Sequence, residues 1–274
     1  MVTQPWVTVT APASVPYRYG LFSAAAVLDP VDTREFVAGV QWEQLCLDAP
    51  AAALAPDVPG PRPPMELEAD VEMAHAGPPI RLYTGLVSAL PGREDLIEQA
   101  RQKLTLIEQQ SVEHYAWTGE AGNRPRLADP STEVLGGSAQ PRDVLTGVGL
   151  LEAFISDRTG SIGVLWAPRF TASQLTGAQL TRVEGPRTVA PLGNPIVFAH
   201  TSGVGPDGQV PASGEAWLYA TGPVMVRRGP VSLPTLPQAL STVNNEVFAV
   251  AQRPYLVGWG CAQAAVKVRL PQAA

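Results

Sequence analysis

Apolar positions recur at helical spacing in a long stretch that begins after Pro91-Gly92. Arg93-Glu94-Asp95 places acidic side chains in the first turn, where the helix dipole favours them. The apolar positions that follow are Leu96, Ile97, Ala100, Leu104, Ile107, Val112 and Tyr115. This spacing predicts an amphipathic helix that ends near Gly119. At about 1.5 Å per residue, such a helix is long enough to cross a domain face.

A second helical pattern runs from Pro141 to Gly160. Pro141-Arg142-Asp143 resembles a helix start, and Gly160 is a typical stop. The residues of its apolar stripe are Val144, Val148, Leu151, Phe154 and Ile155. Gly147 and Gly149 weaken the helix locally but permit close packing against a neighbour.

Shorter apolar runs follow and predict strands. The expected strands are 162–166, 180–184, 196–199, 215–221 and 224–228, with turns at Gly185 and at 192–195. Short helical segments are expected at 168–175, starting on its proline, and at 237–240. Two long β-prone runs, 243–250 and 255–270, are expected to be interrupted at Pro254 and at Gly258-Trp259-Gly260. The combination predicts an α+β fold with mixed sheets.

The first 80 residues have a different character. Prolines at 5, 12, 16 and 30 predict an extended arm, and the apolar stretch from Phe36 to Leu47 predicts a strand pair. Prolines then recur up to Pro79, which favours an extended loop. Within it, Glu66, Glu68, Asp70 and Glu72 alternate with apolar residues from Met65 to Met73. This alternation predicts a β-ribbon with a solvated acidic face and a packed apolar face.

Composition and charge exclude several classes of protein. The chain has 274 residues, 45% of them hydrophobic, and its net charge is −6 without a basic run, so tight binding along a phosphate backbone is not expected. No apolar run approaches the roughly 20 residues of a membrane-spanning helix, and no export signal is recognised. Cys46 and Cys261 stand far apart among apolar residues. We interpret them as buried free thiols in a reducing compartment, against the alternatives of a disulfide or a reactive thiol.

The sequence offers no persuasive catalytic, cofactor or metal site. The histidines, His75, His114 and His200, do not form a pair at metal-ligand spacing. Gly136-Gly137-Ser138 lacks the strand and the motif of a nucleophile elbow. The glycine-rich segments 147–149 and 203–208 lack the strand-to-helix context of a phosphate-binding loop. We therefore predict that the protein is not an enzyme and needs no cofactor or metal.

The order of elements resembles a known family. A helix leads through Leu151–Phe154 into the buried strand Ile162–Trp166 and then into Ala167-Pro168-Arg169-Phe170. Leu192-Gly193-Asn194-Pro195-Ile196 follows, then a variable loop and the pair 216–219 and 224–227, and Glu246–Leu270 closes the chain. This pattern resembles the major capsid proteins of tailed phages, whose Hong Kong-type capsid fold encapsulin shells share.

The resemblance implies a division of the chain. Residues 1–35 would be an N-terminal arm, 36–80 an extended β-hairpin loop (E-loop), and 81–140 a peripheral domain with a long spine helix. Residues 141–235 would form the axial domain, and 236–274 would return to the peripheral domain. In the best-known member, Lys-Asn isopeptide bonds join the subunits. No lysine lies between Gln4 and Arg101, so we expect a shell held by non-covalent contacts. Because the chain starts with the arm, no fused scaffolding domain is expected.

The implied function is self-assembly into the icosahedral head of a tailed double-stranded DNA phage, in the virion after assembly in the bacterial host cytoplasm. Expected partners are further copies in pentamers and hexamers, a scaffolding or decoration protein, and weakly contacted DNA, with no membrane. We predict charged intersubunit contacts, whose candidates are Arg62, Glu66, Glu68, Asp70, Glu72, Arg81, Arg93, Arg101, Arg227 and Arg228. The alternatives are an encapsulin-like shell protein, another virion protein such as a connector or decoration protein, and an enzyme acting on a small substrate.

Overall fold

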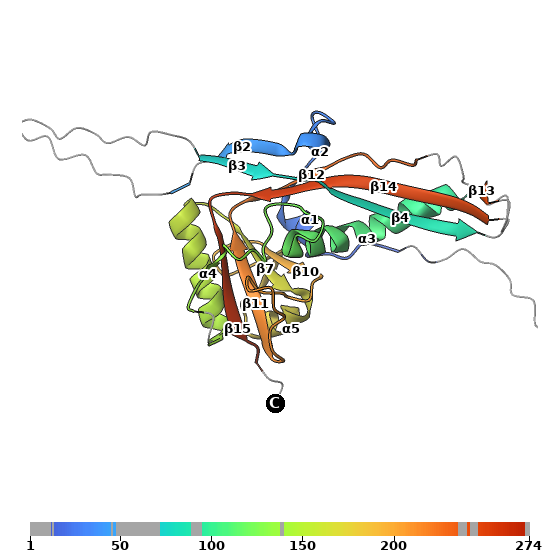
Figure 1. Cartoon of the computed structure of the whole chain (residues 1–274). Coiled ribbons are helices and arrows are strands. Elements are labelled where there is room, and N and C mark those ends of the chain that lie inside the picture. Colours follow the sequence, from blue (N-terminus) through green and yellow to red (C-terminus); the bar gives the residue numbers. More distant parts are fainter. Residues whose placement is uncertain are drawn as a thin grey trace, which may run out of the picture.

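A computed structural model places the described residues in two large β-sheets and two two-stranded ones, with a long helix beside the first large sheet (Figure 1). The structure describes residues 12, 14–44, 46–47, 72–88, 95–137, 140–234, 240–241 and 246–271, with the side chains of 240 and 241 left out. Within them, no helix is long and apolar enough to cross a membrane.

The long helix α3 (Leu96–Thr118) confirms the first prediction. Gly119 ends it in the left-handed conformation, with φ 73°, and donates its N–H to the carbonyl of Tyr115. Ala100, Leu104, Glu108, Val112 and Ala116 are buried along one face at spacings of four. Ile97 was expected on the buried stripe, but it is 55% exposed because it lies off that face.

The first sheet packs against α3. Its strands are β1 (Ala26–Leu28), β12 (Val224–Arg228), β14 (Glu246–Trp259), β13 (Leu240–Ser241) and β4 (Ile80–Ser88). β14 pairs antiparallel with both β12 and β4, and β1 runs parallel to β12. In Figure 1, α3, β4 and β14 extend side by side as the elongated part of the molecule.

The interruption expected at Pro254 is wrong, since β14 runs through it. The carbonyl of Pro254 accepts from Gly229 N–H, and Gly229 stands just beyond the end of β12. The missing N–H of the proline therefore points to the side where the ladder with β12 has ended. The Gly229 carbonyl accepts a hydrogen bond from Arg253 Nε instead. Gly258 also lies within β14, so only Gly260 falls in the expected second break.

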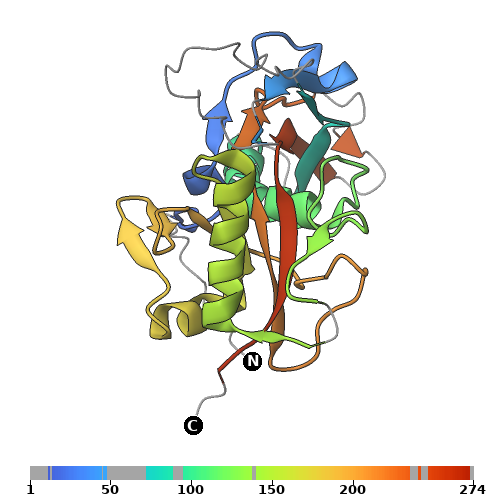
Figure 2. The ribbon, with the colours of Figure 1, turned by 90° about the vertical axis from the view of Figure 1, so that its left-hand side faces the viewer.

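The second sheet is buried on both faces. Its strands are β10 (Ile196–Ala199), β7 (Val164–Pro168), β11 (Glu215–Thr221), β15 (Gln263–Arg269), β5 (Glu133–Val134) and β6 (Arg142–Asp143). Alternate residues point to opposite faces, so Trp166 and Tyr219 join the core that also contains α3. Leu165 and Leu218 join a second core that includes α4 (Val144–Thr159) and Leu175 of α5 (Ala172–Gly177). Figure 2 shows α4 in front of this sheet.

The start of α4 differs from the prediction. Arg142 and Asp143 pair with β15 as the short strand β6, and Asp143 caps the helix by accepting from the N–H of Thr146. An extended residue with an acceptor side chain suits this N-cap position better than a proline-led turn. The predicted end at Gly160 is confirmed by its φ of 56°.

The connection from β7 to β10 contains the expected short helix in two parts. A 3₁₀ turn, η1 (Arg169–Thr171), precedes α5, and Pro168 ends β7 rather than starting the helix. The strand expected at 180–184 is shorter, because β8 (Arg182–Glu184) pairs with β9 (Arg187–Val189) around a turn at Gly185. The strands expected at 196–199, 215–221 and 224–228 are confirmed. Of the expected helical turn at 237–240, only Leu240 is described, and it lies in β13.

Within the expected N-terminal arm, residues 21–28 pack into the fold, whereas residues 1–11 and 13 lie outside the described residues. The short helix α1 (Leu21–Ala24) buries Leu21 completely, and β1 adds to the first sheet. Residues 36–47, expected as a strand pair, contain most of the helix α2 (Glu35–Ala38) and one strand, β2 (Val40–Gln44).

The partner of β2 comes from the far side of the proline-rich loop. β3 (Glu72–Ala76) pairs antiparallel with β2 and forms the β2–β3 hairpin. Most of the predicted acidic ribbon, residues 65–71, lies outside the described residues. Glu72 is exposed as expected, but the packed position expected for Met73 is wrong, since it is 39% exposed. Ala74 and Ala76, of the opposite parity, are the residues that β3 buries.

Candidate assembly surfaces

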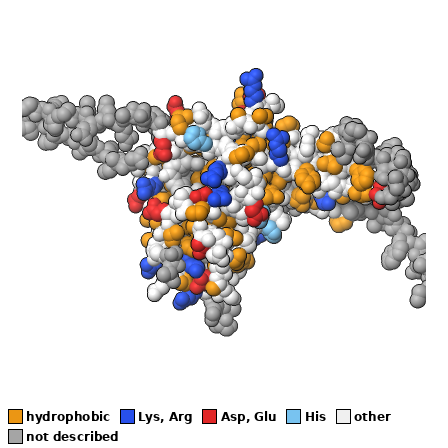
Figure 3. Space-filling model, viewed as in Figure 1, with side chains coloured by type: hydrophobic (Ala, Val, Ile, Leu, Met, Phe, Trp, Pro, Cys, Tyr) orange, Lys and Arg blue, Asp and Glu red, His pale blue; other side chains and the backbone are white. Residues whose placement is uncertain are grey.

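The predicted intersubunit residues do not gather at one place. Arg62, Glu66, Glu68, Asp70 and Arg93 lie outside the described residues. Glu72 is exposed on β3, and Arg101 is exposed on α3, 3.8 Å from Glu98. Arg81 on β4 donates from Nη2 to the carbonyl of Phe36 at 2.8 Å. On the face shown in Figure 3, charges of both signs are interspersed with apolar side chains.

Arg227 already has a partner within the chain. Its Nη2 lies 2.6 Å from Oε1 of Glu35 and its Nε 2.8 Å from Oε2, a two-point ion pair. Both side chains are only 13% exposed. The hydrogen bonds from Arg227 lower the pKa of Glu35 to about 2, and those to Glu35 raise the pKa of Arg227. The pair fastens α2 to β12.

Arg228, the next residue, has a side-chain nitrogen that the described part of the chain leaves unpaired. Its Nε is buried without a hydrogen-bond partner among the described residues. A buried guanidinium N–H without a partner costs free energy, but an atom closed to solvent is closed to a group from another chain as well. The burial of Nε therefore does not favour Arg228 as an intersubunit contact.

Sequence reasoning missed a buried carboxylate that joins three segments. Glu113 of α3 accepts from the Tyr17 hydroxyl at 2.5 Å, from Leu21 N–H at 2.8 Å and from His200 N–H at 2.9 Å. Burial raises the pKa of Glu113 to about 7, although these donors oppose the shift. Burial and the nearby carboxylate also raise the pKa of Tyr17. The periodicity of α3 was the available signal, because position 113 follows the buried Gln109 by four residues.

A second buried carboxylate lies five residues earlier on the same helix. Glu108 accepts from Arg253 Nη1 at 3.1 Å and from the hydroxyl of Tyr255, both on β14. It holds α3 to the longest strand of the first sheet. Glu108 and Glu113 are thus structural anchors of the helix, with all their described partners inside the chain.

The chain crosses between the two sheets at two adjacent points. β11 passes into β12 through Gly222, and β14 passes into β15 through 260–262. Gly222 N–H donates to the carbonyl of Ala262 at 3.0 Å. A Cβ atom on Gly222 would lie 2.1 Å from the Gly260 carbonyl oxygen, so only glycine fits this sheet junction.

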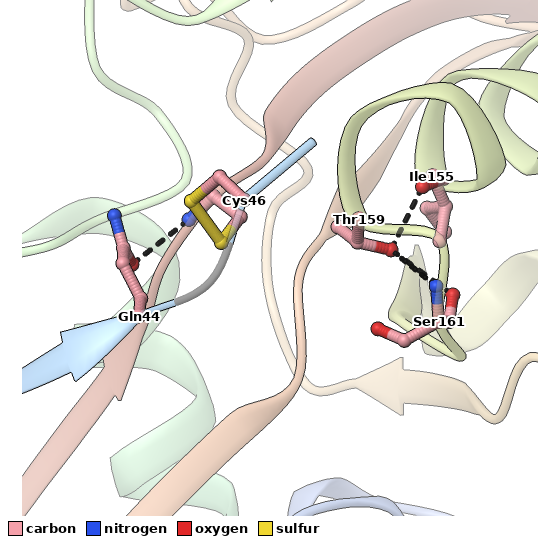
Figure 4. The surroundings of a disulfide bond; sticks show 6 residues. Gln44, Cys46, Ile155, Thr159 and Ser161 are labelled. Carbon is pink, nitrogen blue, oxygen red and sulfur yellow. Dashed lines mark hydrogen bonds between the residues drawn. A yellow bond between two sulfur atoms is a disulfide. The ribbon is translucent and has the colours of Figure 1, made fainter. Parts of the chain in front are cut away.

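In this structure the cysteines are not the free thiols that we expected from the sequence. Cys46 and Cys261 form a disulfide between the end of the β2–β3 hairpin and the sheet junction (Figure 4). Their Cα atoms lie 5.1 Å apart although 215 positions separate them in sequence. Sequence alone could not reveal the pairing, because it depends on how the strands of both sheets are arranged.

Catalytic constellations are not found among the described residues. No group of three His, Cys, Asp or Glu residues there could hold a metal ion. His75 and His200 are exposed, and His114 contacts Glu120 at 3.0 Å on the surface. An open groove of about 710 Å³ lies beside β7 and β9, and its charged lining residues are Glu184 and Arg187. Arg187 donates to the Ser23 carbonyl and Glu184 pairs with Arg182, so neither is positioned for acid-base chemistry.

Comparisons with known proteins give a likeness of structure only. No family model and no curated protein matches this chain. The capsid of a native GTA particle, solved with C5 symmetry, matches with a TM-score of 0.58 and 11% sequence identity, over 98% of this chain and 96% of that one. The capsid of Ralstonia phage GP4 matches with a TM-score of 0.54 and 10% identity, over 100% and 97%. A structure from Microbacterium phage Oxtober96 has a TM-score of 0.51 and 13% identity, over 98% and 96%.

These similarities extend over the arrangement described above, from the N-terminal segment through the long helix and both sheets. The identities are too low to carry more than the fold. The chain therefore has the fold of tailed-phage capsid proteins, the Hong Kong-type capsid fold.

Proposed function

We propose that this chain is a major capsid protein that self-assembles through pentamers and hexamers into the icosahedral head of a tailed double-stranded DNA phage. The observation that carries the proposal is the likeness to two capsid structures over almost the whole length of both chains. This likeness favours a structural role over a catalytic one. The proposed place of the protein is the virion, after assembly in the bacterial host cytoplasm.

The architecture supports a division into two domains. We assign α3, β4 and most of β14 to a peripheral domain, and α4, α5, β7, β10 and β11 to an axial domain. Strand pairing refines the expected bounds. β12 lies in the first sheet although it precedes residue 236, and β15 lies in the second although it follows it. The chain crosses between the proposed domains at the sheet junction.

We propose that neighbouring subunits meet through charged side chains that the fold leaves exposed. Glu72 on the β2–β3 hairpin and Arg101 on α3 are both exposed, and Arg228 at the end of β12 is half-buried. Many weak contacts of this kind add up in a closed lattice, so each can be small. Arg62, Glu66, Glu68, Asp70 and Arg93 stay candidates, and the contacts would be non-covalent. We also propose a scaffolding or decoration protein and weakly contacted DNA as further partners.

Expression of the full chain, followed by sedimentation velocity and negative-stain microscopy, tests the proposal. We expect closed shells, or pentamers and hexamers, in place of a monomer. A compact monomer that persists at high protein concentration contradicts self-assembly.

Charge reversal at the hairpin tests the proposed contacts. Glu72→Lys is expected to shift the sedimentation profile from shells toward small species, because it would place like charges together in a contact with arginine. Asp157→Lys, on the exposed side of α4, changes the charge equally and serves as the matched control. Equal assembly of both variants argues against a contact at Glu72.

An encapsulin-like shell, or another virion protein, is the alternative with the same fold-level support. Electron microscopy distinguishes the first by particle size and contents, since an encapsulin shell encloses protein cargo and a phage head encloses DNA. A connector is expected to form a single ring and no closed shell.

A further inference from the structure

The end of the β2–β3 hairpin rests on the sheet junction. Trp42 lies so close to Gly258 that a Cβ atom there would be 2.6 Å from its ring. Gln44 Oε1 accepts from the N–H of Cys261 at 3.1 Å, as Figure 4 shows beside the disulfide. Leu47 N–H donates to the carbonyl of Arg158 at the end of α4. Trp42, Gln44, Cys46 and Leu47 therefore contact the end of β14, the crossing at 260–262 and the helix that covers the second sheet.

The disulfide is the single covalent link in this contact. Cys261 adopts a positive φ of 62°, which residues other than Gly, Asn and Asp rarely take, so the turn at 260–262 presents its sulfur in a constrained geometry. Both cysteines are only partly buried, so small thiols and disulfides can reach them. The surrounding contacts of Trp42, Gln44 and Leu47 need no disulfide, and they would hold the two thiols near one another when the bond is open.

We propose that Cys46 and Cys261 are a redox modification site. Both are thiols in the reducing cytoplasm. In an oxidising medium they form a disulfide that links the β2–β3 hairpin covalently to the sheet junction. The oxidant is a low-molecular-weight disulfide. One cysteine thiolate attacks it and expels a small thiol, and the second cysteine thiolate then attacks the protein sulfur of the mixed disulfide and expels another. Two cysteine thiols are thereby oxidised to one disulfide, the small disulfide is reduced to two thiols, and the two protons pass to the leaving groups.

The timing of this step has a structural consequence. The proposed function places synthesis in a bacterial cytoplasm, where disulfides rarely persist, and the finished particle outside it. The hairpin would therefore be held by hydrogen bonds and packing while subunits assemble, and covalently afterwards. This timing rests on the proposed function, whereas the chemistry of the cysteine pair does not.

Thiol trapping tests the proposal on the full chain. Cells that express the protein are lysed in iodoacetamide, and intact mass is measured before and after incubation of unalkylated protein with oxidised glutathione. We expect two alkylated cysteines at lysis and none after oxidation, with the loss reversed by dithiothreitol. A disulfide already present at lysis, or two free thiols after oxidation, overturns the proposal, as does a disulfide between chains on a non-reducing gel.

Amide hydrogen exchange gives the second readout. Oxidation should slow exchange of segments 40–47 and 258–263 by about tenfold, because their local opening then requires strain across the closed bond. The Cys46→Ser and Cys261→Ser variants should show the reduced-state rate under both conditions. If oxidation leaves the exchange rates of the wild type unchanged, the disulfide does not restrict opening of the hairpin. Neither readout needs shells, so a failure of assembly and a failure of this proposal can be told apart.

Discussion

The backbone N–H of Leu21 donates to Oε1 of Glu113 across 2.8 Å, although 92 positions separate the two residues. Gly20 makes this approach possible, because a Cβ atom there would lie 2.2 Å from the same oxygen. The N-terminal segment is thereby held to α3. Tyr17 strengthens the attachment through its hydroxyl, and Arg169 lies over the Tyr17 ring at 4.2 Å.

Glu113 predicts a pH dependence of stability. Its pKa rises from 4.5 to about 7 on folding, so the folded state favours the protonated form. This stabilisation is complete below pH 4.5, declines as pH rises from 4.5 to 7, and is constant above that. The loss should be on the order of 3 kcal/mol. In Glu113→Gln the decline over this window should largely disappear in urea unfolding. Parallel pH curves for both proteins would contradict the assignment.

Glu35 predicts the opposite dependence at lower pH. Its pKa falls from 4.5 to about 2 beside Arg227, so the stabilisation is present above pH 4.5 and is lost as pH falls toward 2. Glu35→Gln should lower the free energy of unfolding by about 1–2 kcal/mol at pH 7, because it weakens a two-point charged hydrogen bond. The difference from the wild type should vanish near pH 2, and thermal unfolding across this range measures it. A constant difference would point to lost packing.

Two glycines of α4 form a matched pair of substitutions. A Cβ atom at Gly147 would lie 2.4 Å from Cγ1 of Val268, whereas one at Gly149 would meet nothing within 4 Å. Gly147→Ala should therefore destabilise the protein by about 1–3 kcal/mol, through overpacking against β15. Gly149→Ala should stabilise it by up to about 1 kcal/mol, because alanine has the higher helix propensity. Denaturant unfolding compares them, and equal effects would contradict the close packing of α4 on β15.

The disulfide predicts a stability difference that depends on redox conditions. Cys46→Ser/Cys261→Ser should lower the free energy of unfolding of the oxidised protein by about 2–4 kcal/mol, since the crosslink restricts the unfolded chain. In dithiothreitol, the variant and the wild type should unfold at nearly the same denaturant concentration. If the variant and the wild type differ in free energy of unfolding by the same amount with and without dithiothreitol, the effect comes from packing of the sulfur atoms instead.

Local sequence patterns predicted several helices and strands correctly. Helical spacing with a glycine stop predicted α3 and the end of α4, and short apolar runs predicted β10, β11 and β12 with their bounds. The order of these elements was enough for the fold class. The boundary at Pro254 was mispredicted, because a proline is excluded from a strand only where its missing N–H would face a partner.

For the candidate intersubunit residues, too, the sequence indicated the position in an element but not the contacts. That Arg227 and Arg228 end a strand could be read from the chain, but their difference could not, since Glu35 lies 192 positions from Arg227. Similarly, the acids of α3 were visible in sequence without any indication that Glu108 and Glu113 are buried among donors from other segments. The ten predicted intersubunit residues stay predictions.

By itself, the sequence determined α3, the end of α4, the strands β10, β11 and β12 and the α+β fold, because spacing and turn residues act over a few positions. Only the tertiary structure decided which distant groups meet: Leu21 with Glu113, Arg227 with Glu35, and Cys46 with Cys261. These contacts depend on strand order and on the two crossings between the sheets. Their partners lie 92 to 215 positions apart in the chain, and no local pattern encodes such a pairing.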